Sequence, residues 1–227
     1  MAVTVDTLRR FDIFSKLNSD LLGLLAESAV LKSYGRREVV LSAGGQGDAV
    51  CFVFEGRLQG VDFTIDGREV GLYFSEPGDY VGVLSLFDGD PQPDYVISLS
   101  RSMVIHIPRS ELLSVAKSEP DLFAEFGAHI AKRLRAAMKQ RGLLGITNIN
   151  QRVCAQLYML LQESRLPGVI QNPPTHQELA IMLSTSRETV TRIFQKLQSN
   201  TVLKRNGTAE ILILDAAALE ALATSND

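Results

Sequence analysis

The sequence predicts an α+β protein with an N-terminal antiparallel β-roll of the cupin-like jelly-roll kind, a long helix and a C-terminal winged helix-turn-helix. Short β-rich runs alternate with glycine-containing turns over residues 35–108. Near-heptad apolar spacing follows over 121–144, and two short amphipathic helices flank a polar turn over 175–197. We therefore expect a roll over residues 1–120, a long dimerisation helix and hinge over 121–147, and the winged helix-turn-helix over 148–227.

Composition limits the class of protein. The chain has 227 residues, 45% hydrophobic and 22% charged, with a formal net charge of −3, which indicates one or two globular domains rather than a disordered chain. Two cysteines, Cys51 and Cys154, exclude a disulfide-rich scaffold and a four-thiolate metal site. The first residues are charged, and no run of about 18 apolar residues occurs, so we expect a soluble cytoplasmic protein without a membrane span.

The first half begins with helical spacing and continues as strands. Apolar residues recur every three or four positions over 8–31, and Asn18-Ser19 favours a break and a cap between two short helices. Turns such as Asp66-Gly67 favour hairpins, because glycine adopts positive φ at little cost. The expected strands are 38–41, 49–54, 57–64, 68–74, 95–100 and 103–107.

A helix of more than 20 residues is expected from Pro120 to about Leu144. Its near-heptad pattern favours a dimer seam over a helix that only covers its own domain. The expected seam residues are Phe126, Ile130, Leu134, Ala137, Met138, Arg141 and Leu144. Gly145–Asn148 interrupts the pattern, so we place the hinge there, with Asn148 capping a helix over 149–163.

The most specific pattern lies in residues 175–197. Thr175 and Glu178 predict a capping box, and Ser184–Ser186 forms a tight polar turn. The expected buried stripe of the second helix is Val190, Ile193, Phe194 and Leu197. Two strands around Asn206-Gly207 predict a wing. The alternative to a helix-turn-helix is a helical hairpin on the protein surface whose charged side chains only contact water.

Three side chains at the start of the second helix have the chemistry to read bases. Arg187 and Arg192 can each donate two hydrogen bonds to guanine, and Glu188 can accept one from cytosine N4. Residues 186–205 contain five Lys/Arg and one acid, which suits a phosphate backbone. We therefore predict double-stranded DNA as partner. Further polar contacts are expected from Ser186, Thr189, Thr191, Thr175, His176 and Gln177.

The run Ser186-Arg-Glu-Thr-Val-x-Arg192 resembles the recognition helix of the cyclic-AMP receptor protein branch of the CRP/FNR family. The roll with Pro77-Gly-Asp-Tyr-Val-Gly82, the long helix and the winged helix-turn-helix follow in the family's order, so the resemblance covers nearly the whole chain. It implies a sequence-specific transcription regulator, a homodimer on palindromic TGTGA-like half-sites, and contact with RNA polymerase.

The family's nucleotide cassette is degenerate here. Val83 stands where a ribose-binding glutamate is expected, and Pro93 and Asp94 replace the Arg-Ser pair that neutralises the cyclic phosphate. Because a buried phosphodiester without a cation is costly, we predict that cyclic AMP is not the effector. The remaining apolar pocket would take another effector or be filled by side chains. Its expected lining is Gly82, Val83, Leu84, Ser85, Ala137 and Met138.

Two other functions compete with DNA regulation. A cupin-like enzyme is disfavoured, because no nucleophile–base pair or metal cluster emerges and His106 is the one histidine in the roll. The alternative is an effector-sensing module whose C-terminal helices bind a protein partner. Arg187, Glu188 and Arg192 favour DNA, because a protein-docking helix does not require base-edge chemistry. We therefore predict a regulator that is not an enzyme.

Overall fold

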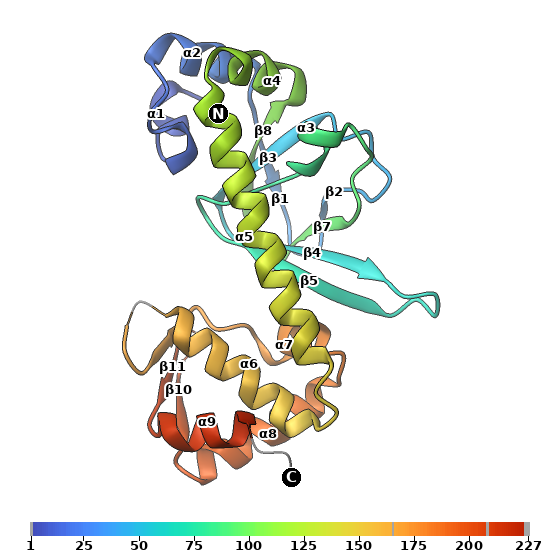
Figure 1. Cartoon of the computed structure of the whole chain (residues 1–227), viewed down its shortest axis with the longest axis vertical. Coiled ribbons are helices and arrows are strands. Elements are labelled where there is room, and N and C mark those ends of the chain that lie inside the picture. The colour runs from blue at the N-terminus through green and yellow to red at the C-terminus, as the bar shows by residue number, and fades with distance from the viewer. Residues whose placement is uncertain (1, 165, 208, 225–227) are drawn as a thin grey trace. The chain divides into compact units, whose positions relative to one another are not determined.

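The chain divides into two compact units, Met1–Arg135 (unit 1) and Ala136–Asp227 (unit 2), in a computed structural model that describes residues 2–164, 166–207 and 209–224 (Figure 1). The boundary falls inside the long helix rather than after residue 147 as predicted. The physical reason is that Leu143, near the end of that helix, is buried in the core of unit 2. No helix among the described residues is long and apolar enough to cross a membrane.

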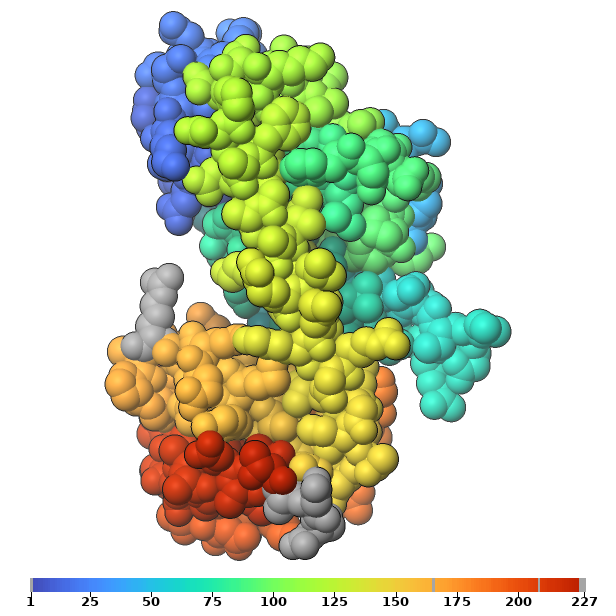
Figure 2. Space-filling view, viewed as in Figure 1, coloured from blue at the N-terminus to red at the C-terminus, as the bar shows by residue number. Residues whose placement is uncertain are grey.

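Two four-stranded antiparallel sheets form the predicted β-roll of unit 1. The first contains, in spatial order, β1 (Val30–Tyr34), β8 (Ser102–Pro108), β3 (Ala49–Glu55) and β6 (Tyr80–Val81). The second contains β2 (Val39–Leu41), β7 (Tyr95–Ser98), β4 (Leu58–Phe63) and β5 (Glu69–Ser75). The β4–β5 hairpin turns at Gly67, which has φ +78°, and its tip stands away from the roll (Figure 2).

Strand β3 shows why this part of the chain is so apolar. Val50 and Phe52 face the helices of unit 1, whereas Cys51 and Val53 face the second sheet. Because both faces of the strand are buried, its sequence is a continuous apolar run rather than an alternating one. The two cores of unit 1 therefore share this strand.

Helices cover the outer face of the first sheet. They are α1 (Val5–Leu8), the 3-10 helix η1 (Asp12–Phe14), α2 (Ser19–Ser28), α4 (Arg109–Ser118) and the start of α5 (Pro120–Leu144). Asn18 caps α2 as predicted, its Oδ1 accepting from Leu21 N at 3.0 Å. The helical stretch ends earlier than residue 31, because Val30 already pairs with His106 in the sheet. Strands β1 and β6 and the short helix α3 (Leu84–Asp88) were not expected from the sequence.

Unit 2 contains the predicted winged helix-turn-helix. Its elements are α6 (Ile149–Glu163), β9 (Val169–Gln171), α7 (His176–Met182), α8 (Arg187–Ser199), β10 (Leu203–Asn206), β11 (Glu210–Ile213) and α9 (Ala216–Thr224). The three strands pair antiparallel in the order β10-β11-β9. Asn148 caps α6 as expected, accepting from Asn150 N and Gln151 N. Helix α9, which packs on α6, was not expected.

Candidate nucleic-acid interface

Helix α7 begins at the predicted capping box. Thr175 Oγ1 accepts from Glu178 N at 3.2 Å, and Glu178 Oε2 accepts from Thr175 N at 2.8 Å. These bonds satisfy two main-chain donors that the first turn of a helix leaves without partners. Leu179 and Ala180 are fully buried, and alanine allows the neighbouring helix to approach closely. Local sequence therefore fixes both the start and the buried face of α7.

The turn between α7 and α8 is tight. Ser184 adopts φ +50°, and Thr185 N donates to Ala180 O at 2.9 Å. Ser186 then caps α8, with its Oγ accepting from Thr189 N at 3.1 Å. The four residues of the predicted apolar stripe are all buried: Val190, Ile193, Phe194 and Leu197. The polar face of α8 is consequently turned away from the core of unit 2.

The three predicted base readers belong to the first two turns of α8. Arg187, Glu188 and Arg192 are all exposed. Arg192 Nη2 donates to Thr189 Oγ1 at 3.3 Å, and that hydroxyl lies 3.0 Å from Ser186 Oγ. The hydroxyl pair thus restricts the orientation of one guanidinium before any ligand arrives, which lowers the entropy lost on binding.

Two of the predicted polar DNA contacts, His176 and Thr191, lie against each other. His176 Nδ1 lies 3.0 Å from Thr191 Oγ1, and its ring lies against Phe194 at a tilt of 45°, with centroids 4.4 Å apart. Thr191 Oγ1 donates to Arg187 O, so its single proton is used and His176 must donate through Nδ1. The other ring nitrogen, Nε2, is buried without a hydrogen-bond partner. His176 therefore ties α7 to α8 rather than facing a phosphate.

Burial and the nearby charges of Arg205 and Arg187 lower the pKa of His176, which keeps its ring neutral. Of the remaining polar candidates, Thr175 and Gln177 are exposed at the start of α7. The hydroxyls of Thr175, Ser186 and Thr189 already take part in helix caps, so their main structural role is to fix the two helices.

Sequence reasoning missed the residues that hold the C-terminal end of α7. Arg152 on α6 donates through Nη1 to Leu183 O at 2.7 Å, and through Nε and Nη2 to Ile146 O at 2.9 and 2.7 Å. Gln140, on the last part of α5, donates to Met182 O at 3.0 Å. Carbonyls at a helix end lack partners within the helix, so these side chains supply them. The predicted hinge, Gly145–Asn148, is thereby fastened to unit 2.

The wing follows α8. Strands β10 and β11 pair over Leu203–Asn206 and Glu210–Ile213, and Gly207 in the turn has φ +61°. Lys204 is exposed, while Arg205 Nε donates to Gly207 O at 3.2 Å. The wing therefore adds positive charge near the reading helix, as its sequence indicated.

The residues of the predicted effector pocket belong to both units. Val83 is buried in the unit 1 core and Ser85 is buried beneath Gly47, whereas Leu84 is half exposed. Gly82 has φ +81°, and an added Cβ would lie 2.9 Å from Ala49 O. The other two predicted residues, Ala137 and Met138, are exposed on unit 2.

The residues present do not fit a cyclic nucleotide. Asp94 is only 5% exposed, and its carboxylate accepts from Tyr73 Oη at 2.6 Å and Gln92 Nε2 at 2.8 Å. Burial raises the pKa of Asp94, while Tyr73 and Arg133 act in the opposite direction. A buried acid at the position where the family places a phosphate-binding hydroxyl would repel a phosphodiester.

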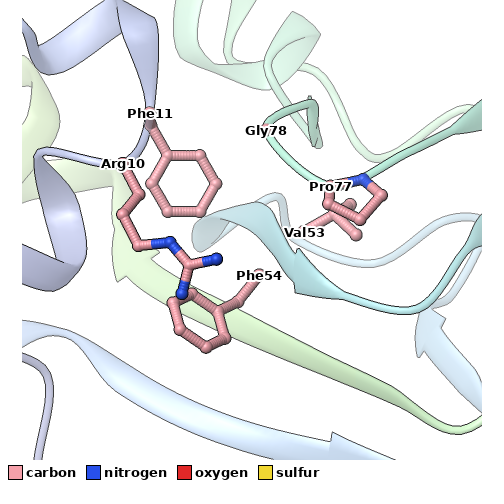
Figure 3. Close-up of a pocket in the computed structure, with 6 residues that line it drawn as sticks. All are labelled: Arg10, Phe11, Val53, Phe54, Pro77 and Gly78. Carbon is pink, nitrogen blue, oxygen red and sulfur yellow. The ribbon is translucent and has the colours of Figure 1, made fainter.

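A small pocket of about 130 Å³ lies elsewhere in unit 1, between the N-terminal helices and the turn before β6 (Figure 3). Its wall includes Phe11 and Pro77, and the Arg10 guanidinium lies over the Phe54 ring at 4.3 Å. Pockets for small ligands usually measure about 300–1,000 Å³. This one is too small for a nucleotide.

The predicted dimer seam divides into buried and exposed residues. Phe126 is fully buried in the unit 1 core, and Ile130 packs against the same core, so Phe126 is a core residue and not part of an exposed seam. Leu134 and Met138 are 59% and 67% exposed, and Leu144 is also exposed. Ala137 and Arg141 are exposed beside them. The exposed apolar residues of the predicted seam therefore begin after Ile130.

No group of three or more metal-binding side chains occurs in the part of the chain that the structure describes. Cys51 Sγ lies 3.2 Å from His106 Nδ1, and His106 Nε2 lies 2.8 Å from Tyr34 Oη. Burial raises the pKa of the Cys51 thiol to about 12 and lowers the pKa of His106 to about 4. The thiol is therefore unreactive, because the thiolate is the nucleophilic form.

Two family models match the chain. Residues 31–119 match the cyclic nucleotide-binding domain, and residues 151–222 match the Crp-like helix-turn-helix domain. The first covers most of the roll, and the second covers α6 through most of α9. The first matched range precedes α5 in the chain, and the second follows it.

Known transcription regulators are about one quarter identical to this chain. The cAMP-activated global transcriptional regulator CRP of Escherichia coli O6:H1 is 26% identical over 133 residues, which cover 57% of this chain and 63% of that protein. The match thus spans less than two thirds of that relative. The CRP-like cAMP-activated global transcriptional regulator of Mycobacterium tuberculosis is 25% identical over 218 residues, 94% of this chain and 97% of that protein.

Solved structures show the same architecture. FixK2 from Bradyrhizobium japonicum superposes with a TM-score of 0.75 at 23% identity, covering 88% of this chain and 99% of that one. At this identity the likeness shows the fold alone. It confirms the predicted roll, long helix and helix-turn-helix.

Proposed function

We propose that this chain, which belongs to the CRP/FNR family of transcription regulators, binds DNA through the exposed face of α8. The observation that carries the proposal is the cluster of Arg187, Glu188 and Arg192 in the first two turns of a capped helix. These are the groups that recognise guanine and cytosine edges in the major groove. The dimension of an α-helix suits that groove, and the N-terminal end of the helix reaches the bases.

The surroundings of α8 support the same function. Lys196, Lys204 and Arg205 add positive charge next to the reading face, so a phosphate backbone would be attracted there. The N-terminus of α8 also carries a partial positive charge from its aligned peptide dipoles. Specificity would then come from the three readers, and much of the affinity from the phosphate contacts.

The finer parts of the proposal follow from the family pattern. A homodimer would read a palindrome with TGTGA-like half-sites, and the exposed Leu134, Met138 and Leu144 would contribute to its seam. Contact with RNA polymerase would convert binding into promoter control. Cyclic AMP would not control the protein, because Asp94 and Val83 occupy cassette positions where the family uses groups that bind the nucleotide.

The test is equilibrium binding to a labelled TGTGA-N6-TCACA duplex and to a scrambled duplex of equal length. We expect the wild-type chain to prefer the first, and Arg187→Ala and Arg192→Ala to lose that preference by about 1–3 kcal/mol each. Lys204→Ala is the matched control, since a phosphate contact should weaken binding to both duplexes equally. Equal affinity of the wild-type chain for both duplexes would contradict direct reading, and absence of binding would favour a protein partner.

A further inference from the structure

One charged side chain of the long helix α5, Arg133, contacts the roll of unit 1. Arg133 Nη2 donates to Ser75 Oγ at 2.6 Å and to Tyr80 O at 3.2 Å, and Nε donates to His129 Nε2 at 2.9 Å. The guanidinium also lies over the Tyr73 ring, 4.1 Å from its centroid. Arg133 thus joins α5 to strands β5 and β6 by both hydrogen bonds and ring stacking.

The contact continues beyond Tyr73 to a buried carboxylate. Tyr73 Oη donates to Asp94 Oδ2, and Gln92 Nε2 donates to Asp94 Oδ1. A buried carboxylate requires compensating donors or charge, and here two neutral donors and the nearby guanidinium provide them. The cation of α5 and the anion of the roll are therefore linked through one aromatic ring.

The backbone leaves room for this arrangement at Gly60 on β4. A Cβ at that position would lie 2.3 Å from Tyr73 Cζ and 2.7 Å from Asp94 Oδ2. The ring and the carboxylate therefore occupy the volume that any larger residue would fill. Glycine at residue 60 is explained by this close approach rather than by backbone conformation.

His129 completes the arrangement one turn earlier on α5. It stacks on Tyr80 with ring centroids 4.1 Å apart and accepts from Arg133 through Nε2, so it must be neutral. Burial and the charge of Arg133 lower the pKa of His129 to about 4, in agreement with that assignment. Two residues of α5 are thus held by the same side of the roll.

We propose that Arg133, Tyr73 and Asp94 form an internal latch that holds α5 on the roll without a cyclic nucleotide. The latch connects the Arg133 guanidinium to the Asp94 carboxylate through the Tyr73 ring. It rests on the proposed function, since it explains how a DNA-binding member of this family works without cyclic AMP. The latch holds the middle of α5 against β5 and β6, and DNA affinity depends on that contact.

Hydrogen exchange on the full-length chain tests the latch directly. In Arg133→Ala, we expect protection of the amides over 122–134 to fall about tenfold or more, the usual effect of losing hydrogen bonds to a charged group. Arg135→Ala is the matched control, because it removes an exposed arginine from the same helix. Tyr73→Phe keeps the ring and removes only the hydroxyl, so it tests the link to Asp94 while the ring contact with Arg133 remains.

Duplex binding of the same variants provides the second readout. We expect Arg133→Ala and Tyr73→Phe to bind the TGTGA-N6-TCACA duplex more weakly than Arg135→Ala, and added cyclic AMP to leave the wild-type affinity unchanged. Protection equal to the control, or lost protection with unchanged duplex affinity, would overturn the latch. If the wild-type chain binds no duplex, the proposed function fails, whereas the exchange measurement still decides whether Arg133 holds α5.

Discussion

Replacing Arg152 by alanine is expected to destabilise unit 2 and weaken duplex binding. Its guanidinium makes three hydrogen bonds to two main-chain carbonyls, Ile146 O and Leu183 O. The first carbonyl lies in the connection after α5, and the second ends α7 just before the turn to the reading helix. One side chain therefore fixes both segments to α6.

The magnitude follows from those contacts. Hydrogen bonds to charged groups each contribute about 1.5–3 kcal/mol, but the three share one guanidinium and two acceptors, and Arg152 is only partly buried. Water can therefore replace some of the lost donors. We expect the free energy of unfolding of unit 2 to fall by about 2–4 kcal/mol, a large fraction of the stability of a typical domain.

Urea denaturation followed by circular dichroism measures this change, and duplex titration measures its effect on binding. Arg152→Lys keeps the charge without the planar fork, so an intermediate loss is expected. Arg101→Ala removes an exposed arginine from unit 1 and controls for net charge. An unchanged denaturation midpoint for Arg152→Ala would refute the argument that this side chain fastens the connection and the turn.

Three further predictions concern unit 1 and the long helix. Gly127→Ala should stabilise the chain by about 0.5–1 kcal/mol in urea denaturation, because a Cβ there meets open space and alanine favours helix. The free energy of unfolding should fall as the pH is lowered from 6.5 toward 4. The reason is that His106 and His129 have a pKa of about 4 in the folded chain and bind protons at higher pH in the unfolded chain. Denaturation at about pH 7 and at about pH 5 measures this difference. Leu134→Glu should convert a dimer into a monomer in sedimentation, since this exposed leucine lies on the proposed seam.

Local signals predicted most of the reading helices. The caps at Thr175, Ser186 and Asn148 depend on side chains within three residues of the main-chain groups they satisfy, so a short stretch of sequence contains both partners. The buried stripe of α8 has helical spacing and was predicted for the same reason. The exposure of Arg187 and Arg192 then follows from which face of α8 is apolar.

The elements that were missed depend on distant partners or have weak local patterns. Strand β1 has mixed polar and apolar residues, and its identity comes from pairing with β8, more than 60 residues later. Strand β6 has two residues, too few to show a period. His176 looked like a phosphate contact because its sequence position is exposed at a helix start, but Thr191 and Phe194 on the next helix draw its ring inward.

For the nucleotide cassette, the sequence predicted which ligand is disfavoured but not which contacts Asp94 makes. The substitutions at Val83, Pro93 and Asp94 show which ligand groups lack partners, so cyclic AMP could be disfavoured from residue types alone. What Asp94 does instead depends on Tyr73, which is 21 residues away and donates to it, and on Arg133, which is 39 residues away and lies over the Tyr73 ring. A buried carboxylate with no ligand to bind would cost stability, so its retention is explained by a partner within the chain. The proposed independence from cyclic AMP and the internal contact of Asp94 would then have the same cause.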